Sequence, residues 1–293
     1  MTILVTGAAG QLGQRVIHHL LETYKIAPAD IVAATRSPDK LAELSAKGVV
    51  TRKADFDDAA NLAQAFAGVD RLLIISTDSL DTPGKRLAQH KAAIDAAKAA
   101  GVKHIFYTSM PNPDKSLVTF APDHLGTEAA IKASGLGYTI LRDAWYMDNF
   151  MMSLPHNLQG GKWYTATAGG KAPYISREDC ALAIAAALAS SNTDSRTYTL
   201  TGSTSYSITD IASTVSAITG RPLEVVDVTD EQLAGGMTGA GLPPFVVDML
   251  VSADANILAG NFDQLSADFT TLTGKEPQTL RSFFEERKAA LAG

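Results

Sequence analysis

The stretch Thr6-Gly7-Ala8-Ala9-Gly10-Gln11-Leu12-Gly13 decides the fold of this chain. It follows a short apolar run, Thr2–Val5, and opens a helical pattern in which Leu12, Val16 and Leu20 share one face. Three glycines at the spacing Gly-x-x-Gly-x-x-Gly, between a strand and a helix, are typical of a turn that binds the pyrophosphate of a dinucleotide. We therefore predict a dinucleotide site at this turn.

The three glycines of the turn have separate predicted roles. They give a tight turn, a close approach of the backbone to the pyrophosphate, and tight packing of the helix. The amides at the helix start then face the phosphates with the positive end of the helix dipole. The alternative is a turn that is only sterically tight. The predicted cofactor-binding residues here are Gly7, Ala9, Gly10, Gln11, Leu12 and Gly13.

Short β-branched runs alternate with alanine-rich helical segments through the first half of the chain. Such near-continuous apolar runs suit a parallel sheet that is covered on both faces, with right-handed crossovers. The pattern predicts an α/β fold, a Rossmann-type doubly wound parallel sheet with a smaller, interleaved C-terminal lobe. The predicted strands are Thr2–Val5, Ile31–Ala34, Val49–Arg52, Arg71–Ile75, His104–Thr108, Tyr138–Leu141 and, later, Arg196–Thr201.

The regular alternation fails after Arg142, where tryptophans and methionines gather. We expect residues 1–150 to form an NAD(P)-binding core, to which residues 176–202 return. Residues 151–293 otherwise form a smaller, mostly helical substrate lobe, with a cleft between the two parts.

Two local expectations concern this second half of the chain. Ser176 and Asp179 predict a capping box for a helix over Cys180–Ala189. The stretch Ser207–Gly293 is expected to be helical, with breaks at glycines and prolines. Cys180, inside the capped helix, is expected to be a small buried side chain.

Composition excludes several classes of protein. The chain has 293 residues with 25 Lys and Arg against 31 Asp and Glu, a net charge of −6, and no long run of either sign. This argues against nucleic acid as a partner. Cys180 is the single cysteine, so an internal disulfide and a four-cysteine metal site are excluded, which suits a reducing cytoplasm. No apolar run approaches the roughly 20 residues of a membrane helix. We expect a cytoplasmic protein without a metal site, membrane anchor or signal peptide.

The end of the second predicted strand indicates which dinucleotide binds. The sequence there is Ala34-Thr35-Arg36-Ser37-Pro38, without the Asp or Glu that NAD-specific folds place against the ribose 2′-hydroxyl. Arg36 can bind a 2′-phosphate through two parallel hydrogen bonds, and Ser37 adds a hydroxyl donor. The sequence favours NADP(H). The alternative is that Arg36 is a solvated loop residue.

Two further segments are expected to line the cofactor groove. Asp55 and Phe56 follow the third strand, where a Rossmann fold meets the adenine ring, although Asp57 or Asp58 can instead cap the next helix. Ser76-Thr77 closes the fourth strand beside the glycine turn, and it either lines the groove or only ends the strand.

Several segments together resemble a known family. They are TGAAGQLG, ATRSP, IFYTSM, DHLGTE, LRDAWYMDNF, GLPPFVVDMLVSADANILAG and TLTGKEPQTLRSFF. Their combination, which covers the whole chain, resembles the NmrA-like branch of the atypical short-chain dehydrogenase/reductases. Within it, the chain resembles bacterial NAD(P)H:quinone oxidoreductases of type 2 and triphenylmethane dye reductases. The resemblance implies a Rossmann core with NADPH, a small lobe over the nicotinamide, and a monomer or a homodimer.

The sequence departs from the standard Ser, Tyr and Lys of that superfamily. Ser109 stands at the serine position, whereas His124 and Glu128 stand at the positions of Tyr-x-x-x-Lys. Lysine lowers the pKa of the tyrosine, and Glu128 has the opposite charge, so the standard proton relay is not expected. Two alternatives remain for His124: it donates a proton, or it only bonds Glu128 one helical turn further on.

This departure favours acceptors that need no strong acid. A quinone ring delocalises the charge that hydride brings, and a triarylmethyl cation is neutralised by it, so positioning over the nicotinamide supplies most of the catalysis. Trp145, Tyr146 and Phe150 are predicted to stack such a flat aromatic substrate. The alternative is that they only pack between the lobes.

The sequence therefore predicts an NADPH-dependent reductase that transfers hydride to quinone-like or cationic aromatic acceptors. The alternative is an NADP(H)-binding, redox-sensing regulator without turnover, which the missing Tyr/Lys pair suits equally well. The catalytic candidates are Ser109, His124 and Tyr146, and the residues expected at the cofactor's nicotinamide end are Trp145, Tyr146 and Asn149.

Overall fold

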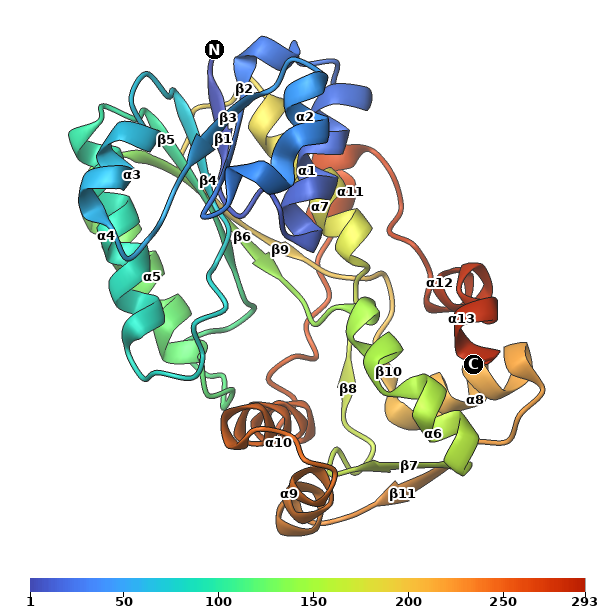
Figure 1. Ribbon diagram of the computed structural model, residues 1–293. Helices are drawn as coiled ribbons and strands as arrows, with labels where there is room; N and C mark the ends of the chain where they lie inside the picture. Colours follow the sequence, from blue (N-terminus) through green and yellow to red (C-terminus); the bar gives the residue numbers. More distant parts are fainter. Residues whose placement is uncertain (293) are drawn as a thin grey trace.

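A seven-stranded parallel sheet forms the centre of the computed structural model, which describes residues 1–292 (Figure 1). The strand order β3-β2-β1-β4-β5-β6-β9 reverses direction between β1 and β4, as in a doubly wound Rossmann sheet. This confirms the predicted fold class. The strands are β1 (Ile3–Val5), β2 (Ile31–Thr35), β3 (Val50–Lys53), β4 (Arg71–Ile74), β5 (His104–Ser109), β6 (Gly137–Asp143) and β9 (Arg196–Leu200).

The central strand β1 explains why apolar runs mark this sheet. Leu4 lies opposite Val32 of β2 and Leu72 of β4, and the backbone of β1 is hydrogen-bonded on both sides. Helices cover both faces of the strand, so Ile3, Leu4 and Val5 are all fully buried. A strand enclosed in this way needs apolar side chains at every position rather than at alternate ones.

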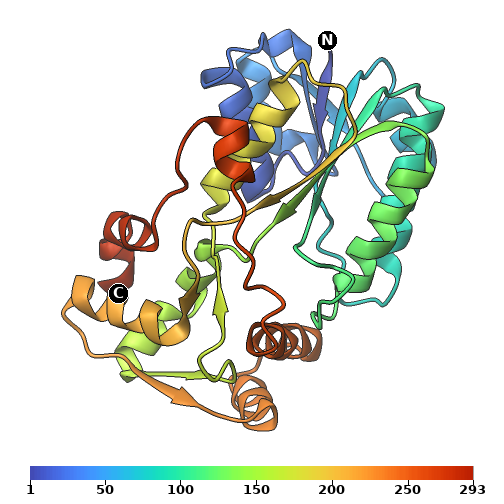
Figure 2. The same ribbon diagram turned by 180° about the vertical axis from the view of Figure 1, so that it is seen from behind.

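Helices form a layer on each face of the sheet, as Figures 1 and 2 show from opposite sides. On one face α1 (Gln11–Glu22) packs against α7 (Arg177–Ala189), which in turn contacts α11 (Asp268–Thr273). On the other face lie α3 (Ala59–Ala65), α4 (Lys85–Ala99) and α5 (Ala121–Ala133). Short connecting helices are η1 (Pro28–Asp30), η2 (Pro38–Leu41) and α2 (Ala42–Ala46).

A smaller lobe lies beyond the carboxyl ends of β5 and β6 and has its own apolar core. Two small sheets belong to it, β10 antiparallel to β8 and β11 parallel to β7. Its elements are η3 (Met147–Met152), α6 (Leu154–Gly160), β7 (Lys162–Thr165), β8 (Lys171–Ala172), β10 (Tyr206–Ser207), α8 (Ile208–Thr219), β11 (Glu224–Asp227), α9 (Asp230–Gly239), α10 (Pro244–Leu258), α12 (Leu280–Glu286) and α13 (Lys288–Ala292).

The expectation that everything after Ser207 is helical was wrong for β11. Its β-branched pair Val225 and Val226 lies opposite Trp163 and Tyr164 of β7. That partner is far away in the sequence, so local periodicity does not reveal the pairing.

The start of α7 differs from the predicted capping box. The Ser176 hydroxyl accepts a hydrogen bond from the Asp179 amide at 3.0 Å, so Ser176 is the N-cap and the helix begins at Arg177. The second half of the box is absent, because the Asp179 carboxylate accepts from the Gln278 amide at 2.8 Å. Asp179 thereby fastens the segment before α12 to the sheet side of the molecule. In residues 1–292, no helix is long and apolar enough to cross a membrane.

Candidate active site

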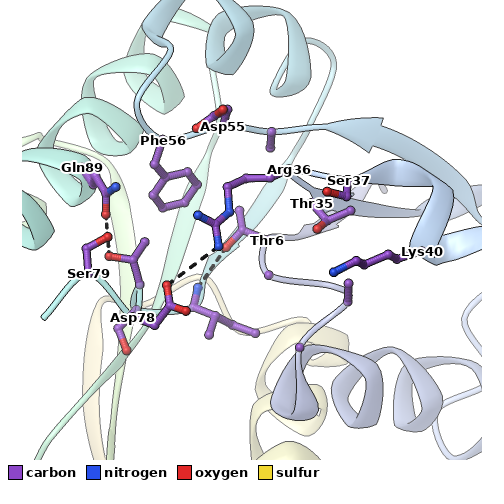
Figure 3. A pocket seen from close by; sticks show the side chains of 17 residues that line it. Thr6, Thr35, Arg36, Ser37, Lys40, Asp55, Phe56, Asp78, Ser79 and Gln89 are labelled. Carbon is purple, nitrogen blue, oxygen red and sulfur yellow. Dashed lines mark hydrogen bonds and ion pairs between the residues drawn. The ribbon is translucent and has the colours of Figure 1, made fainter. Parts of the chain in front are cut away.

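The first cavity, of about 420 Å³, lies at the carboxyl ends of β1, β2 and β4, beside the reversal of strand order (Figure 3). Ligands of open α/β sheets bind at such a position. The structure brings most of the predicted cofactor residues together here. Those that line the cavity are Gly7, Ala9, Gly10, Arg36, Asp55, Phe56, Ser76 and Thr77.

Glycine is required in the turn for two different reasons. Gly7 has a φ of +60°, which L side chains rarely adopt. A Cβ at Gly13 would lie 2.4 Å from the Gly7 carbonyl oxygen, so Gly13 allows α1 to begin against the turn. Gly10 is the N-cap of α1 and offers no side-chain cap, which leaves the first amides of the helix for an anion.

Three predicted residues of the turn do not line the cavity: Gly13, whose role is to let the helix pack close, and Gln11 and Leu12. Leu12 is buried in the core against the sheet. Gln11 is exposed, and its side-chain oxygen accepts a hydrogen bond from Arg177 at 2.7 Å. A backbone amide at either position remains available to a phosphate, but the side chains have structural roles.

Two cations stand on the β2 side of the first cavity. Figure 3 shows the Arg36 and Lys40 side chains extending into the cavity from this same side, with Ser37 between them along the chain. The Arg36 side chain is 68% exposed and its closest carboxylate oxygen, on Asp78, is 4.0 Å away. Sequence reasoning missed Lys40, because it is the short helix η2 that turns this residue back toward the cavity.

On the opposite wall of the first cavity, the acidic residues after β3 have structural hydrogen bonds. Asp58 caps α3 by accepting from the Asn61 amide at 3.0 Å. Asp57 accepts from Gln89 at 3.0 Å, and this hydrogen bond is the main cause that lowers the pKa of Asp57. The Thr77 hydroxyl donates to the same Gln89 at 2.8 Å, so α4 supports the end of β4.

The second cavity, of about 700 Å³, adjoins the first, because Ser76 lines both. It lies where β5 and β6 end and α10 covers them. Most of its wall is apolar, with contributions from Phe120, Met249, Leu250 and Phe262. Predicted residues that line it are Ser109, His124, Trp145, Tyr146 and Asn149.

Glu128 is the centre of a buried ion-pair network at the edge of this site. It is 1% exposed and receives two hydrogen bonds from Arg142, at 2.9 and 2.8 Å. The Ser109 hydroxyl donates to the same carboxylate at 2.8 Å, and Lys132 lies 3.5 Å away. Arg142 therefore compensates the negative charge of Glu128, which stands where standard members of the superfamily have lysine.

Of the two alternatives for His124, the one in which it only bonds Glu128 is wrong. Its Nδ1 lies 2.8 Å from the Tyr107 hydroxyl, and its Nε2 lies 3.0 Å from Arg86. Arginine can only donate, so Nε2 accepts and Nδ1 carries the proton of a neutral ring. Burial, and then the positive charge of Arg86, hold the pKa of His124 well below its usual value. At pH 7 this histidine is neutral, with both nitrogens engaged.

A second titratable pair lies across the cavity. The Tyr146 hydroxyl donates to Asp143 at 2.7 Å, and the other carboxylate oxygen of Asp143 has no partner among the described residues. Burial raises the pKa of Asp143 to about 7. The Arg177 guanidinium carbon lies 4.7 Å from the centroid of the Tyr146 ring, over one of its faces, and this contact restrains the orientation of the ring. Sequence reasoning missed Asp143, because it reads as the end of a strand.

The structure separates Phe150 from Tyr146. Phe150 packs edge-on against Tyr174 at 4.8 Å and Trp163 at 5.6 Å, and it lines a third cavity of about 690 Å³ inside the small lobe. Trp145 lines both the second and the third cavity. Asn149 also lines both, with its oxygen 3.3 Å from an Arg177 nitrogen. A substrate role for Phe150 stays a prediction and does not follow from the lining of the second cavity.

Known proteins resemble the chain over its whole length. Quinone oxidoreductase 2 of Escherichia coli is 35% identical over 278 residues, 95% of this chain and 96% of that protein. An NAD(P)H azoreductase of Xenophilus azovorans is 29% identical over 98% of both chains.

Solved structures are also similar to this chain over nearly its whole length. The NADPH-dependent quinone oxidoreductase of E. coli in complex with NADPH has a TM-score of 0.93, with 34% identity over 97% of this chain and 99% of that one. Triphenylmethane reductase of Citrobacter sp. with NADP(H) has a TM-score of 0.92, with 32% identity over 98% of this chain and 100% of that one. A model of the NmrA-like family matches residues 1–266. The chain belongs to the NmrA-like family.

Proposed function

We propose that this protein is an NADPH-dependent reductase that transfers hydride to flat, electron-poor aromatic acceptors of the quinone or cationic dye class. One observation carries the proposal. A polar cavity with a dinucleotide-type turn opens, at Ser76, into a larger apolar cavity of the size of an aromatic ligand. The relatives named for NAD(P)H, quinones and triphenylmethane or azo dyes agree with this division.

The residues of the first cavity fit NADPH. The amides at the start of α1 and the close approach at Gly10 suit the pyrophosphate. Arg36, Ser37 and Lys40 suit the 2′-phosphate, which a carboxylate at the end of β2 would repel. Phe56 offers an apolar face to the adenine. When bound, NADPH supplies a hydride.

The side chains of the second cavity orient the acceptor and exclude water. Trp145 and Tyr146 provide aromatic faces, and α10 closes the cavity with apolar side chains. The Glu128–Arg142 pair holds Ser109 in place. His124 is neutral and engaged on both nitrogens, so it orients neighbouring groups and delivers no proton. Acceptors that need no strong acid fit such a site.

Steady-state oxidation of NADPH tests the proposal. Purified protein is assayed with a panel of benzoquinones and naphthoquinones and a cationic triarylmethane dye, and NADPH binding is titrated separately by fluorescence. We expect NADPH binding and turnover with at least one acceptor class. Tight NADPH binding without turnover of any acceptor would instead support a redox-sensing regulator.

A further inference from the structure

Arg86 is a buried cation that lacks a carboxylate partner. It is the second residue of α4 and is 5% exposed. Its one side-chain hydrogen bond goes to His124 at 3.0 Å, and Nε and Nη1 have no partner among residues 1–292. The guanidinium lies over the Phe120 ring at 5.0 Å. Asp123 and Asp78 attract it only across longer distances, without an ion pair.

Other shielded arginines of this chain are compensated. Arg142 is bound by Glu128, and Arg177 lies 3.4 Å from Asp148. Arg71 donates to the backbone carbonyls of Leu188, Ser190 and Asn192. A guanidinium does not lose its proton in proteins, so burial of Arg86 without an anion is costly. That cost is reduced if a ligand brings the negative charge.

Arg86 lies in the cavity in which the acceptor is proposed to bind, so the negative charge can come from the reduced acceptor. Arg86 lines the second cavity together with Ser109 and His124. A neutral quinone that accepts hydride gains two electrons and one proton, so the product carries one negative charge on oxygen until it takes a proton from water. A triarylmethyl cation that accepts hydride becomes neutral and carries no such charge.

We propose, resting on the reductase function above, that Arg86 stabilises the oxyanion formed on the reduced acceptor and so selects neutral quinones over cationic aromatic acceptors. A fixed cation in a cavity that excludes water stabilises developing negative charge strongly, and the same cation repels a positively charged acceptor. Arg86 is thus a specificity-determining residue for this site, beyond the residues that bind the cofactor.

The first test compares two acceptors in matched variants. Arg86→Met replaces the cation by an apolar side chain of similar length, which buried sites tolerate well. Lys91→Met removes one exposed positive charge from the same helix and serves as the control for net charge. We expect Arg86→Met to lower kcat/KM for a neutral naphthoquinone by about a hundredfold or more, as loss of one oxyanion donor does. The value for crystal violet, a cationic dye, stays or rises, and the NADPH Kd stays unchanged.

Arg86→Lys should restore part of the quinone activity, because it restores charge without the planar fork. Equal losses for quinone and dye in Arg86→Met, with folding intact by circular dichroism, would overturn the proposal. So would a Lys91→Met protein that shows the same change in acceptor preference.

The second test does not depend on turnover. 4-Nitrophenol is titrated into the NADP⁺-bound protein at fixed pH, and its absorbance reports how much of the bound ligand is phenolate. The wild type and Lys91→Met should favour phenolate relative to free solution, whereas Arg86→Met should favour the neutral phenol. An unchanged phenolate fraction in Arg86→Met refutes the role of Arg86, even if the wild type reduces no acceptor and the reductase proposal fails separately.

Discussion

The two adjoining cavities of this protein are built in opposite ways. The first consists of backbone and short polar segments at the ends of three neighbouring strands, and its cations are exposed. The second is assembled from β5, β6, α4, α5 and α10, and the charged side chains of Arg86 in its wall and of Glu128 at its edge are buried. The first cavity thus depends on close backbone fit, whereas the second depends on how buried charges are compensated. Substitutions in either cavity can test this difference.

The largest effect is expected from Gly13→Val in the turn of the first cavity. Its Cβ would lie 2.4 Å from the Gly7 oxygen and 2.9 Å from the Ala8 Cα, and a shift of these backbone atoms costs more than a shift of a flexible side chain. We expect loss of detectable NADPH binding and a Tm lower by about 10 °C. Gly160→Ala, where nothing lies within 4 Å of the new Cβ, is the control. If the Gly13→Val protein bound NADPH normally, binding in the first cavity would not depend on close backbone fit.

Asp143→Asn tests buried charge in the second cavity through pH. The folded carboxyl has a pKa of about 7 and the unfolded one about 3.8, so between these values the folded state binds more protons. Wild-type stability therefore falls as pH rises from about 4 to 7, by on the order of 4 kcal/mol for this group. Asparagine does not ionise and still accepts from Tyr146. The Tm of the variant relative to wild type should rise between pH 5 and pH 8, and a constant difference would contradict the assignment.

Arg36→Ala tests the exposed cations of the first cavity. We expect the wild type to bind NADPH at least about tenfold more tightly than NADH, and the variant to lose most of that preference, roughly 1.4 kcal/mol. Dissociation constants for both cofactors, measured in both proteins, decide the matter. Lys40→Ala, at the second cation of the same site, shows whether the two cations share the 2′-phosphate. Equal affinities of the wild type for the two cofactors would contradict the prediction.

His124→Ala should slow quinone reduction by about tenfold at most. A neutral ring with both nitrogens engaged positions its neighbours, whereas a true general acid contributes on the order of 10²–10⁴-fold. The readout is kcat at saturating NADPH from pH 6 to pH 8. A thousandfold loss in a folded variant that binds NADPH would make His124 the essential acid.

The smallest effects are expected at the aromatic wall. Trp145→Ala and Tyr146→Ala should raise the quinone KM several-fold, because stacking on a ring contributes about 0.5–1.5 kcal/mol beyond burial. Phe150→Leu should lower Tm and leave this KM unchanged, since Phe150 packs against Tyr174 and Trp163. If all three variants changed KM alike, the second and third cavities would act as one substrate site.

How far the sequence predicts this molecule follows from how local each interaction is. The glycine turn and the Arg36 segment are each encoded within a few consecutive residues, so spacing alone indicates them. Glu128 and Arg142 are fourteen residues apart, and Arg86 and His124 are thirty-eight apart. Those pairs meet only after the sheet has formed, and no periodicity in the sequence marks them.

The departure at His124 and Glu128 shows the same limit within one helix. Their spacing suggested a bond between them, but both side chains turn to residues of other elements. Burial decides this, because a buried carboxylate needs a cation and a buried histidine is stabilised in its neutral form. The sequence thus indicated that the standard relay was missing without indicating what replaced it.

The way the small lobe is threaded limits how such a protein can acquire new acceptors. The chain leaves the sheet after β6, returns with α7 and β9, leaves again, and returns once more with α11 before α12. A single recombination event between two relatives therefore cannot transfer a whole acceptor-binding lobe, because every long exchanged stretch also carries part of the sheet or its helices. Changes of acceptor in this lineage are expected to accumulate as single substitutions within an intact lobe. Libraries that vary the second cavity residue by residue should therefore contain more folded proteins than libraries of chimeras.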